Sequence, residues 1–459
     1  MYQIDFNHPI HVYFIGIGGI SMSGLASILL SEHFTVSGSD RQRSDLTDSL
    51  SALGAVIYYG QKEENLDIHP DLIVYTSAVH PDNPEYIRGK ALGIPFLTRA
   101  ELLGQLMKNY KLPIAVSGTH GKTTTTSMLS QILLEADTDP TLSIGGIYPA
   151  IGGNIRVGQS EYFVTEACEY TNSFLSLYPR IAIILNIEED HLDFFKDIDD
   201  IRRSFRRFAM LLPEDGTLII NGDIDHLEEI TEGLSCRVIT YGRSLSCDYH
   251  PEDISHDEYG HPSFNLCGKY GETIGSYALQ IPGIHNIYNA IAAIAAAKAL
   301  DLPEEKIRRG LSDFRGTDRR FEYKGVKCGF TIIDDYAHHP TEITATLQAA
   351  RNYPHSKLWC VFQPHTYTRT KAFMPEFAKA LSHADQVILT DIYAAREKDT
   401  LGISSKDLQK EIEKLGCSCF YFSSFKEIEN FILENCTKND LLITMGAGDV
   451  VKIAENLLK

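Results

Sequence analysis

The 459-residue sequence predicts an α/β protein with three domains. A chain of this length is too long for one hydrophobic core, and the usual domain size gives about three. In its first and last thirds, short apolar segments alternate with segments of helical periodicity, which favours parallel sheets joined by crossover helices. A glycine-rich turn near residue 118 opens a further strand–helix series. We place the domains at residues 1–110, 111–313 and 314–459.

The composition is typical of a globular protein, and its cysteines are typical of a protein in a reducing compartment. Hydrophobic residues make up 43% of the chain and charged residues 22%, and no apolar run reaches ~18 residues. The segment Met1–Phe6 lacks the basic and apolar regions of a signal peptide. Nine cysteines are scattered without a Cys-x-x-Cys pair, which argues against a disulfide framework or a zinc site. We expect a cytoplasmic protein without membrane insertion.

The formal net charge of −19 disfavours nucleic acid as a partner, because 61 acidic residues outnumber 42 basic ones. An acidic protein that binds phosphate groups must gather its cations locally. The candidate cations each lie within a motif rather than in a run of charges: Lys122, Arg319, Arg320 and Arg369.

The first domain is predicted to contain a Rossmann-like, doubly wound parallel sheet. Strands are expected at residues 11–15, 34–40 and 72–75, with a helix ending at Leu30. The turn Gly16-x-Gly18-Gly19, followed by Asp40, is similar to a dinucleotide fingerprint, but Ser21 stands where the third glycine belongs. Three interpretations remain open here: a tight turn without a ligand, a nicotinamide site, and a site for another phosphate-bearing ligand.

The central domain opens with a phosphate-binding loop of the P-loop ATPase type. An apolar strand at 114–116 is followed by the loop and then by a helical pattern. In such loops backbone N–H groups face an anion, the lysine reaches the terminal phosphates, and the threonine hydroxyl binds Mg²⁺. Val116 stands where the usual spacing has glycine, so this is a shortened variant, and a purely structural glycine turn is the alternative. The expected phosphate contacts are Gly118, Thr119, His120, Gly121, Lys122, Thr123 and Thr124.

Acidic residues follow two strands of the same domain. Glu166 ends an apolar strand at 162–165, and Asp190-His191 lies in the loop after a strand at 181–185. A carboxylate at a strand end beside a phosphate loop suits Mg²⁺, which prefers hard oxygen ligands. Histidine is a less typical ligand for Mg²⁺, so His191 fits a metal site and an ordinary loop equally well.

The rest of the central domain combines an antiparallel insertion with a pair of amides. Between residues 236 and 280, short alternating strands without helices indicate the insertion. Asn286 and Asn289 then share one face of an alanine-rich helix, where their amides match the edge of adenine. Capping of this helix by Asn286 is the alternative.

The third domain is predicted to be a second Rossmann-like α/β domain with a parallel sheet. Segment 315–322 lies at its joint with the central domain, where an arginine can hold a transferring phosphoryl group; a solvated basic turn is the alternative. Segments 334–342 and 363–370 each follow a strand, where ligands of parallel sheets bind. They offer a carboxylate for ribose hydroxyls, and His338 and Arg369 for the carboxylate of a small zwitterion.

Taken together, these motifs resemble those of the muramyl ligases, ATP-dependent enzymes that form amide bonds in peptidoglycan precursor synthesis. The resemblance covers essentially the whole chain. It rests on segments 16–24, 118–124, 166–170, 190–191, 285–289, 319–321, 334–342 and 363–370. The double histidine in Asp-Tyr-Ala-His-His-Pro at 335–340 points to the alanine-adding branch. The implied reaction joins L-alanine to the lactyl carboxylate of UDP-N-acetylmuramate through an acyl phosphate, with ATP and Mg²⁺.

The resemblance also implies a role for each motif. The residues near the UDP-sugar would be Gly16, Gly18, Gly19, Asp40 and Ser77. Besides the phosphate loop, ATP would contact Asn286 and Asn289 through adenine, Asp335 through ribose and Arg320 through the γ-phosphate. The metal ligands would be Thr123, Glu166 and His191, and the alanine pocket would contain Tyr336, His338 and Arg369. The implied catalytic residues are Lys122, His191, Arg320 and His338.

Two residues depart from the pattern of some family members. Cys168 stands where some carry aspartate, and Thr366 stands where some carry arginine, which leaves alanine binding more dependent on Arg369. Three rival functions stay open: a recycling ligase that adds a whole peptide to the same sugar nucleotide, an NAD-linked oxidoreductase, and a nucleotide-binding protein without catalysis. We expect a monomer or a weak homodimer.

Overall fold

The computed structural model describes residues 2–76, 78–395 and 397–459, and the chain divides into two compact units. The first unit comprises Met1–Thr126, Leu133–Glu188 and Ile198–Ile239. The second unit comprises Ser127–Ile132, Glu189–Asp197 and Thr240–Lys459. Within the described part of the chain, no helix is both long enough and apolar enough to cross a membrane.

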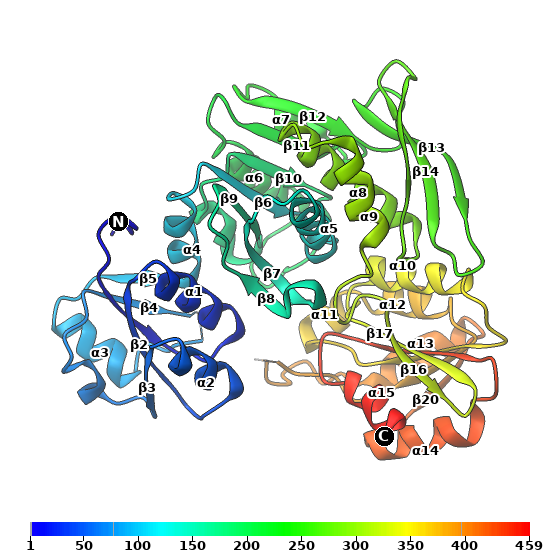
Figure 1. Cartoon of the computed structure of the whole chain (residues 1–459). Helices are drawn as coiled ribbons and strands as arrows, with labels where there is room; N and C mark the ends of the chain where they lie inside the picture. The colour runs from blue at the N-terminus through cyan, green and yellow to red at the C-terminus, as the bar shows by residue number, and fades with distance from the viewer. Residues whose placement is uncertain (1, 77, 396) are drawn as a thin grey trace. The chain divides into compact units, whose positions relative to one another are not determined.

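The first unit begins with a five-stranded sheet in the order β3-β2-β1-β4-β5, in which all pairs are parallel (Figure 1). Its strands are β1 (His11–Ile15), β2 (Thr35–Asp40), β3 (Val56–Tyr59), β4 (Leu72–Tyr75) and β5 (Phe96–Thr98). Its helices are α1 (Ile20–Ser31), α2 (Asp45–Ala52), α3 (Pro84–Ala91), α4 (Arg99–Met107) and the 3-10 helix η1 (Glu63–Leu66). The strand order reverses beside β1, so the turn after β1 lies where ligands of doubly wound sheets bind. The predicted Rossmann-like sheet is confirmed.

A second sheet of the first unit carries the phosphate loop. Its order is β12-β11-β10-β6-β9-β7-β8, and β8 alone among these described pairs runs antiparallel to its neighbour β7. The strands are β6 (Leu112–Ser117), β7 (Thr141–Tyr148), β8 (Gly153–Arg156), β9 (Tyr162–Glu166), β10 (Ile181–Ile184), β11 (Thr217–Asn221) and β12 (Arg237–Tyr241). The helices are α5 (Lys122–Glu135), α6 (Ile198–Ala209), α7 (Leu227–Thr231), η2 (Pro149–Ile151) and η3 (Tyr170–Ser176). Strand β6 lies inside the sheet, so the loop that follows it starts from a buried strand end.

The second unit contains the predicted antiparallel insertion. Strands β13 (Tyr249–His256), β14 (Pro262–Gly268) and β15 (Thr273–Ala278) pair in antiparallel fashion. Helix α8 (Ile284–Ala299) packs against β13 and β14, and α9 (Glu304–Asp313) packs against β15. Alanines fill the buried side of α8, which allows a close approach to the strands.

The C-terminal sheet has the order β16-β17-β21-β18-β19-β20 and is parallel apart from its edge strand β16. Its strands are β16 (Glu322–Lys327), β17 (Phe330–Asp335), β18 (Leu358–Phe362), β19 (Gln386–Leu389), β20 (Ser418–Tyr421) and β21 (Leu441–Met445). The edge strand was not predicted. Cys328 and Gly329 both have positive φ, and such two-residue turns join antiparallel strands.

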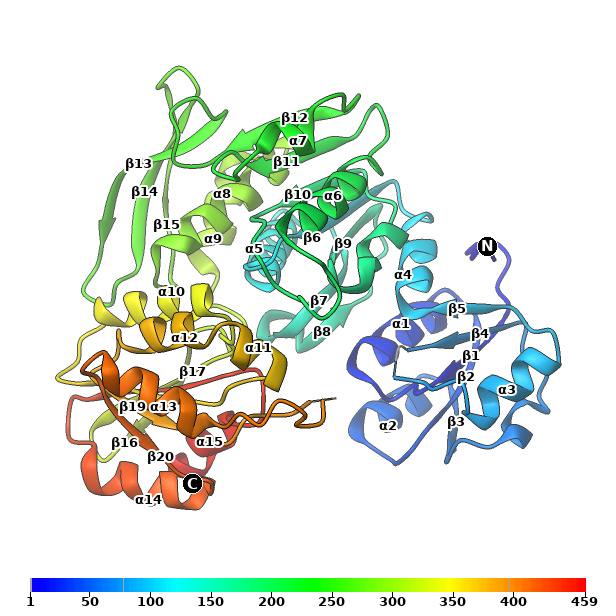
Figure 2. The same cartoon turned by 180° about the vertical axis from the view of Figure 1, so that it is seen from behind.

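Helices cover both faces of this C-terminal sheet (Figures 1 and 2). Residues of α10 (Pro340–Arg351), α12 (Met374–Leu381) and α13 (Ser405–Lys414) form one buried cluster with the strands. Residues of α14 (Phe425–Asn435) and α15 (Val451–Leu458) form the other. Helix α11 (Tyr367–Ala372) lies in the segment after β18. The loops that follow β17, β18 and β21 therefore extend from a sheet with a buried cluster on each face.

Candidate active site

The glycine turn after β1 is closed by Asp40. The Asp40 Oδ2 accepts a hydrogen bond of 2.8 Å from the Gly18 amide, and a Cβ on Gly18 would lie 2.8 Å from that same oxygen. Gly16 has φ +84°, a conformation that favours glycine. Helix α1 begins after Gly19 without a side-chain cap, so its N-terminus suits an anion. Asp40 holds this turn, and Ser77 lies outside the described residues.

A pocket of the first unit is lined by residues from the start of α1 and from the end of β9. Ser21 and Arg99 line it together with Glu166 and Cys168. Sequence reasoning missed Arg99, which supplies a cation next to two predicted ligand segments. No local motif marks it, because Arg99 is simply the first residue of α4.

The phosphate loop is held by the segment that follows β10. A Cβ on Gly118 would lie 2.9 Å from the Leu185 Cβ, and Gly118 has φ +143°, so both space and backbone conformation require glycine there. The His120 amide donates to the Asn186 Oδ1 at 2.7 Å, and the Asn186 Nδ2 donates back to the His120 carbonyl at 3.0 Å. These two hydrogen bonds hold the loop against the segment that follows β10.

Lys122 begins helix α5 and contacts a buried acid. Its Nζ donates to the Glu169 Oε2 at 3.0 Å and to the carbonyls of Gly118 and Thr119 at 2.5 and 3.1 Å. Burial lowers the pKa of the lysine, but the charge of Glu169 outweighs it and raises the pKa above its usual value. Lys122 is therefore a fixed cation at the loop. Sequence reasoning quoted Glu169 within a motif but assigned it no role; a second acid three residues after Glu166 was the available signal.

Glu166 is oriented by the neighbouring strand β7. Its Oε1 accepts a hydrogen bond of 2.5 Å from the Gly145 amide. A Cβ on Gly145 would lie 2.5 Å from the Glu166 Oε2, so glycine leaves room for the carboxylate. Thr123 is buried in the first turn of α5. A hydroxyl and a carboxylate are hard oxygen donors, which Mg²⁺ prefers.

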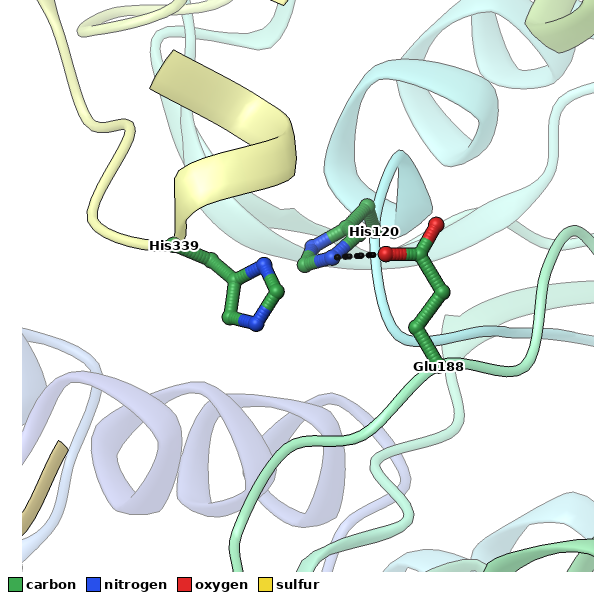
Figure 3. A group of neighbouring side chains, drawn as sticks. All are labelled: His120, Glu188 and His339. Atoms are coloured by element: carbon green, nitrogen blue, oxygen red, sulfur yellow. Dashed lines mark ion pairs between the residues drawn. The ribbon is translucent and has the colours of Figure 1, made fainter. Parts of the chain in front are cut away.

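His120 faces Glu188 at the rim of the loop, as Figure 3 shows. The His120 Nε2 lies 3.5 Å from the Glu188 Oε2. The Glu188 amide donates to the Thr119 Oγ1 at 2.9 Å, which ties the two segments together. These contacts orient His120 and Thr119, two of the predicted ATP contacts.

In the second unit, the predicted adenine amides lie inside α8. The Asn289 Nδ2 donates to the Asn286 Oδ1 at 3.0 Å, and the Asn286 Nδ2 donates to the Pro282 carbonyl at 2.7 Å. The N-cap residue of α8 is Gly283, without a side-chain hydrogen bond. Capping by Asn286 is therefore excluded, and both amides remain a linked, buried pair.

Arg320 and Asp335 lie together at the end of β17. The two oxygens of Asp335 accept hydrogen bonds from the Phe321 and Ala337 amides at 2.8 and 2.7 Å. Burial raises the pKa of Asp335 to about 6, against the opposing charge of Arg320. The Arg320 guanidinium also lies 5.0 Å from the ring centroid of Tyr336, a cation–π contact.

Arg319, one of the four candidate cations predicted from the sequence, anchors this segment. Its side chain bonds to Asp334 at 2.9 Å and to the carbonyls of Gly446 and Gly448 at 2.6 and 3.1 Å. These bonds join β17 to the loop after β21. The segment is therefore not a solvated basic turn.

Arg369 forms a buried ion pair with Asp190. The Arg369 Nη2 donates to the Asp190 Oδ1 at 2.6 Å, and each side chain is 10% exposed. Burial raises the pKa of Asp190, but Arg369 outweighs it and holds this pKa well below its usual range. His191 lies beside the pair, with its Nε2 3.8 Å from the Asp190 Oδ2.

A histidine cluster flanks Arg369. The ring centroids of His338 and His365 are 5.7 Å apart, and the His338 Nδ1 lies 3.2 Å from the Glu342 Oε2. Burial, together with His338 and Arg369, lowers the pKa of His365 to about 4, so this imidazole is neutral near pH 7. Sequence reasoning assigned no role to His365, although it lies in the quoted segment after β18.

Thr366 helps to hold the helix that carries Arg369. Thr366 has φ +65° and is the N-cap of α11, where its Oγ1 accepts a hydrogen bond of 3.4 Å from the Arg369 amide. Some family members carry arginine at this position. In this chain Thr366 instead caps the helix and holds the Arg369 backbone.

Three family descriptions match successive segments of the chain. "Mur ligase family, catalytic domain" matches residues 11–111, "Mur ligase middle domain" matches 116–297, and "Mur ligase, glutamate ligase domain" matches 319–448. The three matches follow one another along the chain and together cover most of it.

Full-length similarity extends to individual proteins. The UDP-N-acetylmuramate–L-alanine ligase of Agathobacter rectalis is 60% identical over 459 residues, covering all of both chains. The crystal structure of the UDP-N-acetylmuramate–alanine ligase of Thermotoga maritima superposes with a TM-score of 0.81 at 28% identity, covering 98% of both chains. A murein peptide ligase structure from Psychrobacter arcticus gives a TM-score of 0.70 at 26% identity, also covering 98% of both. From its sequence and its fold, the chain belongs to the Mur ligase family.

Proposed function

We propose that this chain is an ATP-dependent ligase that joins L-alanine to the lactyl carboxylate of UDP-N-acetylmuramate, releasing ADP and phosphate. The observation that carries the proposal is the 60% identity, over the full length, to the alanine-adding ligase of Agathobacter rectalis. The enzyme would act in peptidoglycan precursor synthesis in the cytoplasm, as a monomer or a weak homodimer.

The three substrates are assigned to the three predicted domains. Residues 1–110 would bind the UDP-sugar through the Gly16–Gly19 turn, which stands at the reversal of strand order beside β1. Residues 111–313 would bind ATP through the phosphate loop and the amides of Asn286 and Asn289. Residues 314–459 would bind L-alanine through Tyr336, His338 and Arg369 and would complete the ATP site with Asp335 and Arg320.

The geometry supports a phosphoryl-transfer step followed by amide formation. The lactyl carboxylate attacks the γ-phosphorus in line and displaces ADP, while Lys122 and Arg320 stabilise the charge on the transferring oxygens. The alanine amine then attacks the carbonyl of the acyl phosphate, and phosphate leaves. Water must be excluded while this anhydride exists, because hydrolysis competes with the amine. His191 and His338 are candidates for the base that accepts the amine proton.

The oxygen donors near the phosphate loop fit Mg²⁺. Thr123 and Glu166 would hold one ion, and the Gly145 amide already orients the Glu166 carboxylate. His191 would be a ligand of a second ion. Bound at these residues, Mg²⁺ would offset the negative charge of the ATP phosphates.

Phosphate release with single acceptors tests the proposal. The purified chain is incubated with ATP, Mg²⁺ and UDP-N-acetylmuramate, and then with L-alanine, L-serine, glycine or the tripeptide L-Ala-D-Glu-diaminopimelate. Turnover with L-alanine above the other acceptors is expected. One methyl group discriminates by only ~1–3 kcal/mol, so a slower reaction with glycine fits the proposal. Turnover with the tripeptide alone would assign the chain to the recycling ligases instead.

A further inference from the structure

One face of the β13–β14 hairpin brings an imidazole, a carboxylate and a thiol together. His250 and Glu252 lie two residues apart on β13, so their side chains leave the same face of the sheet. Cys267 on β14 is the cross-strand partner of His250 in the antiparallel register. One ligand atom from each of the three residues lies within 4.8 Å of those of the other two. None of these residues belongs to the candidate active site.

His250 has an unsatisfied, buried side chain. It is 1% exposed, and neither ring nitrogen has a hydrogen-bond partner among the described residues. The Nε2 lies 3.4 Å from the Glu252 Oε1 without hydrogen-bond geometry. Buried polar groups in native proteins are nearly always paired, so this imidazole, aimed at a carboxylate and beside a thiol, points to a ligand.

We propose that His250, Glu252 and Cys267 bind a zinc ion. Zinc accepts nitrogen, sulfur and oxygen ligands together, whereas Mg²⁺ and Ca²⁺ strongly prefer oxygen and do not favour a thiolate. Zinc–ligand bonds of ~2.0–2.3 Å in a tetrahedron place ligand atoms roughly 3.5 Å apart, close to the separation of the His250 Nε2 and the Glu252 Oε1.

The exposure of the three side chains also fits a zinc site. His250 and Cys267 are buried, while the Glu252 side chain is 46% exposed, so water can reach the fourth position from that side. The Cys267 thiol would lose its proton to solvent on binding, because thiolate is the ligand form. The ion would join β13 to β14 and satisfy His250. The proposed zinc site takes no part in the ligase reaction. A negative result for zinc binding therefore leaves the proposed ligase function untouched, and the reverse also holds.

Metal binding by the full-length chain tests the site. The protein is dialysed against Zn²⁺ with excess Mg²⁺, and bound zinc is measured per chain. Co²⁺ is then substituted, because a thiolate ligand produces a charge-transfer band that oxygen and nitrogen ligands lack. Glu252→Gln removes an exposed ligand with little risk to folding, and Glu258→Gln is its matched control on the same insertion. Cys267→Ser has Cys236→Ser, another buried cysteine, as its control.

Wild type and both controls are expected to bind one zinc per chain at this site. Glu252→Gln should weaken zinc binding about tenfold or more, and Cys267→Ser should abolish the thiolate–cobalt band. Circular dichroism and a cooperative urea-unfolding transition confirm that each variant is folded. If Cys267→Ser fails to fold, the test of the zinc site rests on the difference in zinc affinity between Glu252→Gln and Glu258→Gln. A wild-type protein without the thiolate band, or with zinc affinity equal to that of Glu252→Gln, would overturn the proposal.

Discussion

The guanidinium of Arg369 donates to the Asp190 carboxylate at 2.6 Å, and both side chains are almost buried. Arg369 is also, together with His338, a residue that we propose for the carboxylate of L-alanine. An arginine offers five N–H donors, so a second carboxylate can bind while Asp190 keeps the guanidinium in place. Asp190 therefore positions the alanine-binding arginine in this proposal.

Replacing Arg369 by lysine should raise the KM for L-alanine. Lysine keeps the charge but loses the forked donor geometry, and a hydrogen bond to a charged group contributes about 1.5–3 kcal/mol. We expect a rise of about tenfold or more with little change in the KM for ATP. Arg351→Lys is the control, because Arg351 also pairs with an aspartate, Asp385, at 2.8 Å but is not among the residues proposed for the alanine pocket. An unchanged alanine KM in Arg369→Lys would remove Arg369 from the pocket.

Replacing Lys122 by methionine should abolish turnover and also lower stability. The kcat should fall at least about a hundredfold, because a cation at the transferring phosphate is lost. Stability should fall by about 3 kcal/mol, because Glu169 is 2% exposed and loses the cation that faces it.

The double variant Lys122→Met/Glu169→Gln separates the two effects. Neutralising Glu169 should restore most of the stability, measured by urea unfolding, without restoring phosphate release. UDP-N-acetylmuramate binding, measured by calorimetry, should stay close to that of wild type in both variants. Phosphate release at the wild-type rate in Lys122→Met would show that this loop is not the ATP site.

Features encoded by neighbouring residues could be predicted from the sequence, whereas contacts between distant segments could not. The phosphate loop can be predicted because a strand, Gly118 and Gly121-Lys122-Thr123 lie within about ten residues. The pair Arg369–Asp190 spans 179 positions, and no local pattern links its members. The same holds for His250 and Cys267. The absence of a Cys-x-x-Cys pair argues against a zinc site, but the cross-strand register places these two side chains next to each other.

Replacing Gly145 by alanine should raise the Mg²⁺ concentration that the reaction needs. The new Cβ would lie 2.5 Å from the Glu166 Oε2, so the carboxylate must move. Loss of an orienting contact typically weakens metal binding about tenfold, and the half-saturating Mg²⁺ concentration should rise accordingly. Gly153→Ala on the adjacent strand is the control, because its Cβ meets no atom within 4 Å. Equal Mg²⁺ dependence in the two variants would argue against Glu166 as a ligand.

Asp335 should give the protein a stability that falls as pH rises from about 4 to about 6. Burial raises the folded-state pKa of Asp335 to about 6, whereas an unfolded aspartate titrates near 3.9. Between these values the folded state binds the proton and the unfolded state does not, so raising the pH favours unfolding. A difference of two pKa units corresponds to about 3 kcal/mol, fully developed above pH 6.

Asp335→Asn should remove this contribution, because asparagine does not titrate. Urea unfolding of both proteins at several pH values gives the free energy of unfolding of the variant relative to that of wild type. The titration of all other groups cancels in this difference. This relative stability should rise with pH between about 4 and 6 and then level off. A difference that stays constant across this range would mean that Asp335 titrates at its ordinary pKa. The two oxygens of the Asp335 carboxylate also accept hydrogen bonds from the Phe321 and Ala337 amides, so asparagine cannot replace it fully. If Asp335 contacts ribose, Asp335→Asn should therefore also bind ATP more weakly.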